Sequence, residues 1–205
     1  MAETNTVVIA TRNKGKAKEF EALFKERGLQ IKTLLDYPDI EDVEETGYTF
    51  KDNALLKAET IAEHLQTTVI ADDSGLAVEA LLGQPGVFSA RYAGEEKDDA
   101  KNNAKLLTEL ADVKDQERRA TFHCALALAH PQKESLVVQG ELKGAITGIP
   151  RGENGFGYDS LFLLPELDKT LAELSEREKN KISHRANALS RLDSLLDDWL
   201  ESLPH

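Results

Sequence analysis

The first third of the chain alternates short apolar runs with longer stretches of helical periodicity. Residues 6–10 (TVVIA) are apolar and rich in β-branched side chains, which predicts a buried strand. Apolar residues then recur at helical spacing over residues 17–24, so a helix is predicted that ends near Gly28. Residues 30–34 predict a second strand. This β-loop-α-β opening is typical of a layered α/β fold.

A second helix and strand follow the same pattern. Thr49 and Asp52 predict the N-terminal cap of a helix over residues 50–65, whose apolar side chains mark one face. Residues 67–71 (TTVIA) predict a short buried strand that leads directly into an acidic segment. A further surface helix is predicted over residues 98–110.

Strict alternation replaces the helical period in the middle of the chain. Apolar and polar positions alternate over residues 120–128 and again over residues 136–142, with a polar turn between them, which predicts an antiparallel hairpin. Residues 160–164 predict another strand. A long C-terminal helix is predicted to carry its apolar stripe over residues 189–203.

These elements predict one mixed α/β domain over residues 1–205, with two lobes and a cleft between them. The net charge of −12 argues against a general nucleic-acid binder, which needs basic surface. The single cysteine, Cys124, excludes an internal disulfide, and no stretch approaches the roughly 20 apolar residues that span a bilayer. The N-terminus has no signal-peptide pattern, so we expect a cytoplasmic protein without nucleic-acid or membrane partners.

Four polar segments interrupt the predicted elements at strand ends and helix starts, where open α/β sheets bind ligands. The first lies between the first strand and the first helix and comprises Thr11, Arg12, Asn13, Lys14, Gly15 and Lys16. Backbone N–H groups at a helix N-terminus suit an anion, and Lys16 adds a positive charge, although the spacing is not that of a P-loop. The segment predicts either a phosphate contact or a basic loop that only caps the helix.

The second and third segments are acidic, with Glu44 beside Glu45 and Asp72 beside Asp73. Mg²⁺ is typically held by one or two carboxylates together with substrate phosphates and waters. Acid pairs in an acid-rich protein often face solvent only, but Asp72 and Asp73 directly follow a predicted buried strand. A metal site and a solvated acidic surface therefore both remain open.

The fourth segment, residues 152–159 (GENGFGYD), places glycines around two aromatic side chains. Such a loop allows close approach to a flat ligand, on which an aromatic ring can stack, or it is only a turn. Downstream, Lys179, His184 and Arg185 lie before or at the start of the last helix, where they cap that helix or donate hydrogen bonds to a ligand.

Taken together and in this order, these segments resemble the inosine triphosphate pyrophosphatase family, also called the dITP/XTP pyrophosphatases. The resemblance runs through nearly the whole chain, on the motifs ATRNKGK, EETGYTFKDNALLKA, IADDSGLAVEAL, PGVFSARYAG, ENGFGYDSLF and KNKISHRANAL. It implies an α/β fold with a mixed central sheet, flanking helices and two lobes around a nucleotide-binding cleft, assembled as a homodimer. It also implies hydrolysis of ITP, dITP and XTP to the nucleoside monophosphate and pyrophosphate, with Mg²⁺ as the cofactor.

The resemblance also implies roles for individual residues. Asp73 corresponds to the family's catalytic acidic residue, which is also a metal ligand. Glu44 corresponds to a metal-associated position, and Ser74 to a substrate contact. The loop from Thr11 to Lys16 is implied to contact the triphosphate, although Arg12 stands where some relatives carry glycine; its side chain contacts phosphate or points to solvent. The base-side loop is implied to comprise Phe156, Gly157, Tyr158 and Asp159. Lys179, His184 and Arg185 are implied to be further substrate contacts.

The physical chemistry agrees with these roles. A triphosphate is highly anionic, so a metal ion and Lys16 must neutralise it before water attacks, while Asp73 binds the metal or accepts the proton of the water. Donors such as Lys179, His184 or Arg185 would bond to the O6 acceptor of hypoxanthine or xanthine and reject the 6-amino group of adenine. The alternatives are a Maf-like pyrophosphatase for other modified nucleotides and a non-catalytic nucleotide sensor.

Overall fold

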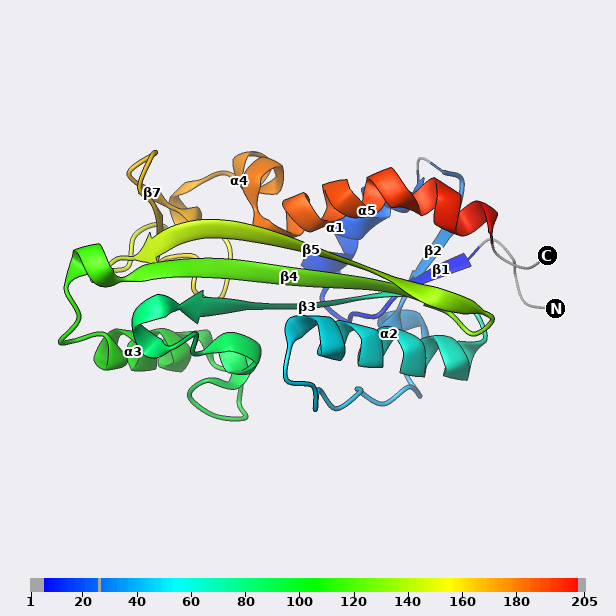
Figure 1. Cartoon of the computed structure of the whole chain (residues 1–205), viewed down its shortest axis with the longest axis horizontal. Helices are drawn as coiled ribbons and strands as arrows, with labels where there is room; N and C mark the ends of the chain where they lie inside the picture. The colour runs from blue at the N-terminus through cyan, green and yellow to red at the C-terminus, as the bar shows by residue number, and fades with distance from the viewer. Residues whose placement is uncertain (1–5, 26, 203–205) are drawn as a thin grey trace. The chain divides into compact units, whose positions relative to one another are not determined.

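Seven strands form a single mixed sheet in the computed structural model, which describes residues 6–25 and 27–202 (Figure 1). The sheet order is β2-β1-β3-β4-β5-β6-β7. The strands are β1 (Thr6–Ile9), β2 (Gln30–Thr33), β3 (Thr68–Val78), β4 (Arg119–His130), β5 (Lys133–Ile146), β6 (Phe162–Leu164) and β7 (Lys169–Thr170). β1 is parallel to β2 and β3, whereas β6 is antiparallel to β5 and β7, so the predicted mixed sheet is confirmed.

The α-helices of the described chain are α1 (Lys14–Lys25), α2 (Phe50–Leu65), α3 (Asp99–Glu109), α4 (Glu176–Ile182) and α5 (His184–Glu201). The predicted cap of α2 is confirmed, because the Thr49 side chain accepts a hydrogen bond from the Asp52 N–H. The sequence did not predict α4 or β7. The last residues of the predicted C-terminal stripe, from Leu203 onward, lie outside the described residues. Within the described chain, no helix is both long and apolar enough to cross a bilayer.

The chain folds into two compact units. The first comprises the chain up to Asp73, then Ala125–Gly140, and the chain from Ala188 onward. In this unit α2 packs its alanines and Ile61 against one face of β1, β3 and β4, while α1 and α5 lie on the other side (Figure 1). The alternate residues Ala125, Ala127 and Ala129 of β4 belong to this α2 core, and their small side chains let the helix lie close to the sheet.

The second unit comprises Ser74–Cys124 and Glu141–Asn187. Its core joins the far end of β3, the first half of β4, β6 and the inner face of α3, and it includes Leu76, Leu106, Phe122 and Phe162. Phe122 and Phe162 lie with their ring centroids 4.6 Å apart. This unit carries the glycine-rich loop of residues 152–159.

Two sequence expectations were wrong in detail. The predicted short strand at residues 67–71 continues as β3 to Val78, because Leu76 and Val78 are also buried and the strand passes from the first unit into the second. Asp72 and Asp73 are therefore inside a strand instead of in the loop that follows it. The alternation expected in β4 holds only near its start, since residues 124–129 are buried on both faces.

Candidate functional site

The loop between β1 and α1 is built by its own hydrogen bonds. Thr11 Oγ1 accepts a bond from the Asn13 N–H at 3.1 Å, and Asn13 Oδ1 accepts one from the Lys16 N–H at 3.2 Å. Asn13 therefore caps α1, whose first turn contains the exposed Lys14 and then Gly15. The capping role considered for this segment is confirmed, and its contact with a triphosphate stays a prediction.

Arg12 has a role that the sequence did not indicate. Its guanidinium donates to the Leu34 carbonyl at 2.8 Å and to the Ile40 carbonyl, and it lies 3.3 Å from the Asp42 carboxylate. These bonds tie the first loop to the segment that follows β2. In this structure the side chain therefore holds protein groups together.

Lys16 brings the first polar segment to the third. Its Nζ lies 3.0 Å from Asp72 Oδ2, and the Asp72 side chain is only 4% exposed. The sheet explains this contact: β1 pairs with β3 in parallel up to Ile9 and Ile70, so residue 72 lies just past the end of β1, beside the loop that leads to Lys16. A cation and buried acids thus meet at the carboxyl end of β1, as expected for ligand sites of parallel strands.

Asp73, the next residue of β3, is held from α2. The buried Asn53 donates from Nδ2 to Asp73 Oδ2 at 3.0 Å, while its Oδ1 accepts a bond from the Gly47 N–H at 2.7 Å. A Cβ at residue 47 would lie 2.6 Å from Asn53 Oδ1, so this approach requires glycine. One asparagine therefore links the segment that contains Glu44 to the predicted catalytic carboxylate.

Lys57 lies one helical turn beyond Asn53 and joins the same group. Its ammonium is 2.5 Å from Glu45 Oε1 and donates to the Asp72 carbonyl at 3.2 Å. Burial alone would lower the pKa of Lys57, but the negative charges of Glu45 and Asp72 outweigh burial and raise that pKa. Lys57 is therefore a firmly held positive charge.

The pKa of Asp73 is raised to about 6, first by burial and then by the negative charge of Glu45. Asp72 adds to this effect, while the bond from Asn53 and the charge of Lys57 oppose it. A carboxylate whose pKa lies near neutrality can accept a proton and is still mostly ionised at pH 7. A carboxyl group whose pKa is shifted by burial and by a specific charged neighbour is a candidate for a functional site.

Sequence reasoning did not single out Asn53 or Lys57, and it named Glu45 only as a member of the acidic pair with Glu44. Asn53 and Lys57 are four residues apart on a helix that otherwise turns apolar side chains toward the sheet, and this spacing is the signal that places them on one face. Glu44, the predicted metal-associated residue, is exposed, whereas the Glu45 side chain is 25% exposed and contacts Lys57. Among the described residues, no three acidic, histidine or cysteine side chains converge as a ready metal centre.

The glycine-rich loop of the second unit is centred on Asp159. This buried carboxylate accepts the Phe156 N–H at 3.0 Å and lies 2.6 Å from Lys179 Nζ. The same ammonium lies 4.8 Å from the centroid of the Phe156 ring, which is half exposed. The structure thus brings together the predicted residues Phe156, Asp159 and Lys179, with about half of the aromatic side chain exposed to solvent.

The remaining predicted residues of this unit are mostly buried. Tyr158 donates its hydroxyl to the Ser89 carbonyl at 2.7 Å, and burial raises its pKa. His184 stacks on Phe122 with ring centroids 4.8 Å apart, and Arg185 follows it at the start of α5. Ser74, directly after Asp73, is half-buried.

A family model described as the Ham1 family matches residues 7–195, which is nearly the whole chain. The chain belongs to the Ham1 family. Two similar relatives are both described as dITP/XTP pyrophosphatases. The chain is 58% identical over 190 residues to the dITP/XTP pyrophosphatase of Halalkalibacterium halodurans, covering 93% of this chain and 98% of the relative. It is also 58% identical over 195 residues to the dITP/XTP pyrophosphatase of Geobacillus kaustophilus, covering 95% and 94%.

A solved structure of the Ham1 family has the same fold. The Staphylococcus aureus Ham1 protein superimposes with a TM-score of 0.88 at 46% identity, covering 95% of this chain and 99% of that chain. The predicted family and fold class are therefore confirmed.

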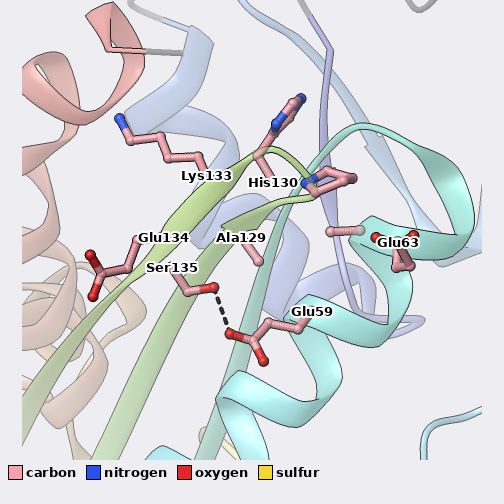
Figure 2. Close-up of a pocket in the computed structure, with 9 residues that line it drawn as sticks. Glu59, Glu63, Ala129, His130, Lys133, Glu134 and Ser135 are labelled. Carbon is pink, nitrogen blue, oxygen red and sulfur yellow. Dashed lines mark hydrogen bonds between the residues drawn. The ribbon is translucent and has the colours of Figure 1, made fainter. Parts of the chain in front are cut away.

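A pocket of about 290 Å³ in this Ham1 chain contains none of the predicted site residues (Figure 2). It lies where the β4–β5 turn meets the C-terminal half of α2. In its wall Ser135 donates to Glu59 at 2.7 Å, whereas Lys133 points away and binds the Trp199 carbonyl instead. The pocket is thus separate from the group of charged residues around Asp73.

Proposed function

We propose that the chain hydrolyses the non-standard purine nucleoside triphosphates ITP, dITP and XTP to the monophosphate and pyrophosphate. Membership of the Ham1 family supports this function, as do relatives described as dITP/XTP pyrophosphatases that match over almost their whole length. The observation that carries the proposal is the buried Asp73 carboxylate, with its raised pKa, set among Glu45, Lys57 and Lys16-bound Asp72. This group combines a base with fixed positive charges, as hydrolysis of a polyphosphate requires.

Of the two lysines in this group, Lys16 would receive the triphosphate. Lys16 is a quarter exposed at the start of α1, where backbone N–H groups also favour an anion. When phosphate binds, Lys16 would exchange part of its contact with Asp72 for phosphate oxygens. Lys57 is more firmly held by Glu45 and would keep the acidic group in place. Asp73 would take the proton of the attacking water.

We propose Mg²⁺ as the cofactor. The cluster fits it: Asp73 and Glu45 are near enough that the charge of Glu45 raises the pKa of Asp73, and two carboxylates plus phosphates are a typical Mg²⁺ ligand set. Glu45 is the better candidate than Glu44 for the second ligand, because Glu44 is exposed. Bound Mg²⁺ would supply charge neutralisation and polarise the phosphoryl oxygens.

The Phe156 loop would read the base. The half-exposed ring of Phe156 offers a stacking face, and the Lys179 ammonium beside it is a donor for the O6 acceptor of hypoxanthine or xanthine. Adenine carries a donor at that position and would face Lys179 donor to donor. His184 and Arg185 are further donors of the same unit, and we propose them as additional contacts.

We also propose that the protein is a cytoplasmic homodimer. The family resemblance of the motifs supports the dimer. For the location, the single cysteine cannot form an internal disulfide and so gives no sign of an oxidising compartment. Size-exclusion chromatography with light scattering tests the dimer directly, since a mass near that of one 22.6 kDa chain would contradict it.

The decisive experiment is pyrophosphate release from ITP, dITP, XTP, ATP, GTP, CTP and UTP, each with Mg²⁺ and with excess chelator. We expect ITP, dITP and XTP to be hydrolysed far faster than the others, and only with Mg²⁺. Preference for a pyrimidine or methylated nucleotide would indicate a Maf-like activity. Binding of ITP without turnover would indicate a sensor.

Glu44→Gln and Glu45→Gln form a matched pair that tests which glutamate binds the metal. We expect only Glu45→Gln to raise substantially the Mg²⁺ concentration that the enzyme needs for activity.

A further inference from the structure

Gly157, in the middle of the glycine-rich loop, is held at both of its backbone polar groups by one helix. Its N–H donates to Asp99 Oδ2 at 2.7 Å, and its carbonyl accepts a bond from Asn103 Nδ2 at 3.0 Å. Asp99 and Asn103 are four residues apart and thus share one face of α3. Gly157 has a φ of +61°, a conformation that other residues rarely adopt. The loop therefore turns at the residue that α3 holds by two hydrogen bonds.

Asp99 is not needed to cap its own helix. Asp98 already performs that role, because its side chain accepts a bond from the Lys101 N–H at 3.0 Å. The Asp99 carboxylate instead accepts a bond from a backbone N–H 58 residues further along the chain. A charged acceptor makes this a stronger hydrogen bond than one between neutral groups.

Asn103 is also poorly explained by stability. Its Oδ1 is buried and, among the described residues, has no hydrogen-bond partner. Leucine at this position would remove the cost of the unpartnered acceptor but would leave the Gly157 carbonyl without its donor, so the two effects on stability partly cancel. What the asparagine adds is the one bond from its Nδ2 to the Gly157 carbonyl.

The neighbours of Gly157 are the residues that contact the base in the proposed function. Phe156 precedes it, and Asp159, two residues later, holds the ammonium of Lys179 at 2.6 Å. Tyr158 anchors the other side of the bend through its bond to the Ser89 carbonyl. A shift of the Gly157 peptide would therefore move the stacking ring and the donor of Lys179 together.

We propose that Asp99 and Asn103 are positioning residues that set the geometry of the base-recognition loop without touching substrate. This inference rests on the proposed function. It predicts that loss of either side chain weakens recognition of the base and leaves recognition of the phosphates intact.

The test uses Asn103→Leu and Asp99→Ala in the full chain, with Asp99→Asn as the conservative variant that keeps an acceptor oxygen. Lys101→Ala is the control, since this residue of α3 is exposed and its side chain pairs with Glu96 at 3.4 Å. Binding of inosine monophosphate and of inorganic tripolyphosphate is measured by calorimetry, together with kcat and KM for ITP and ATP and the melting temperature.

We expect Asn103→Leu and Asp99→Ala to weaken inosine monophosphate binding about five- to tenfold, the effect of losing one hydrogen bond. KM for ITP should rise by a similar factor while kcat, tripolyphosphate affinity and melting temperature change little. Asp99→Asn should recover part of the loss, and Lys101→Ala should match the wild type.

Equal loss of inosine monophosphate and tripolyphosphate binding, or a falling melting temperature that accounts for the loss, would show that the pair is merely structural. Unchanged inosine monophosphate affinity in both variants would also overturn the inference, while the proposed function would stand. A wild type that neither hydrolyses ITP nor binds inosine monophosphate would instead refute the proposed function, and the inference with it.

Discussion

Lys16 and Asp72 form an ion pair of 3.0 Å between the start of α1 and the strand that carries Asp73. The pair joins two segments that are 56 residues apart and places a cation beside the acidic cluster. Because Asp72 is almost fully buried and Lys16 is partly exposed, the lysine is the partner that can turn toward a bound anion.

Lys16→Ala should weaken triphosphate binding and turnover while affecting inosine monophosphate less, because the lost charge faces the phosphates. Steady-state kinetics with ITP and calorimetry with inosine monophosphate measure the two effects. We also expect a stability loss of about 1–3 kcal/mol in chemical denaturation, since Asp72 loses a partner for its buried charge. Unchanged kcat and KM for ITP would mean that the loop only caps α1.

Asp73→Asn should leave the protein folded but reduce kcat for ITP at least about a hundredfold, as expected when a general base or metal ligand is lost. The substitution keeps an oxygen that can accept the bond from Asn53 and removes the repulsion with Glu45. The melting temperature should therefore equal or exceed that of the wild type. Turnover at saturating Mg²⁺ and the melting temperature must be measured on the same preparation; a folded, active variant would move the catalytic role to another acid.

The raised pKa of Asp73 also predicts a pH dependence of stability in the metal-free protein. Its pKa rises from 3.8 to about 6 on folding, so between these values the native state binds more protons than the unfolded state. The free energy of unfolding therefore falls as pH rises through this window, and the loss is complete above pH 6. We expect the wild type to lose about 2 kcal/mol relative to Asp73→Asn between pH 4 and pH 7. Denaturant melts with chelator present measure this difference, and parallel curves for the two proteins would contradict it.

Gly47→Ala should reduce both stability and turnover, because the new Cβ would lie 2.6 Å from Asn53 Oδ1 and 2.7 Å from Asp52 Cβ. Asn53 would have to move, and with it the bond that orients Asp73. Tyr48→Ala is the matched control, since that neighbouring side chain is 95% exposed. Thermal melts and ITP kinetics of both variants are compared. If Gly47→Ala behaves like the control, the contact between Gly47 and Asn53 is not needed to orient Asp73.

Local patterns predicted most elements of this fold and identified polar segments of which the first three are linked to one another in the structure. The helical period and the Thr49 cap identified α2, and β-branched runs identified β1 and the start of β3. The sequence did not predict the second half of β3, because two aspartates and a glycine are typical of a loop. In the structure the strand continues to Val78, since Leu76 and Val78 are buried in the core. Tertiary context decided that question.

The contacts within the site were harder to foresee. The spacing of Asn53 and Lys57 places them on one face of α2, but only the sheet register shows that this face meets Asp72 and Asp73. The choice between Glu44 and Glu45 likewise depends on how the loop before α2 turns, which Gly47 and Asn53 determine. Side-chain partners distant in sequence leave no periodic signal along the chain.

The boundary between the two compact units falls inside regular elements: between Asp73 and Ser74 in β3, within β4 and β5, and between Asn187 and Ala188 in α5. Each unit is consequently assembled from separate stretches of the chain, and no contiguous gene fragment encodes either. Neither unit can be cut out as one continuous segment of the chain. The residues proposed to bind phosphates and those proposed to bind the base can therefore be varied singly but not exchanged as two separate segments.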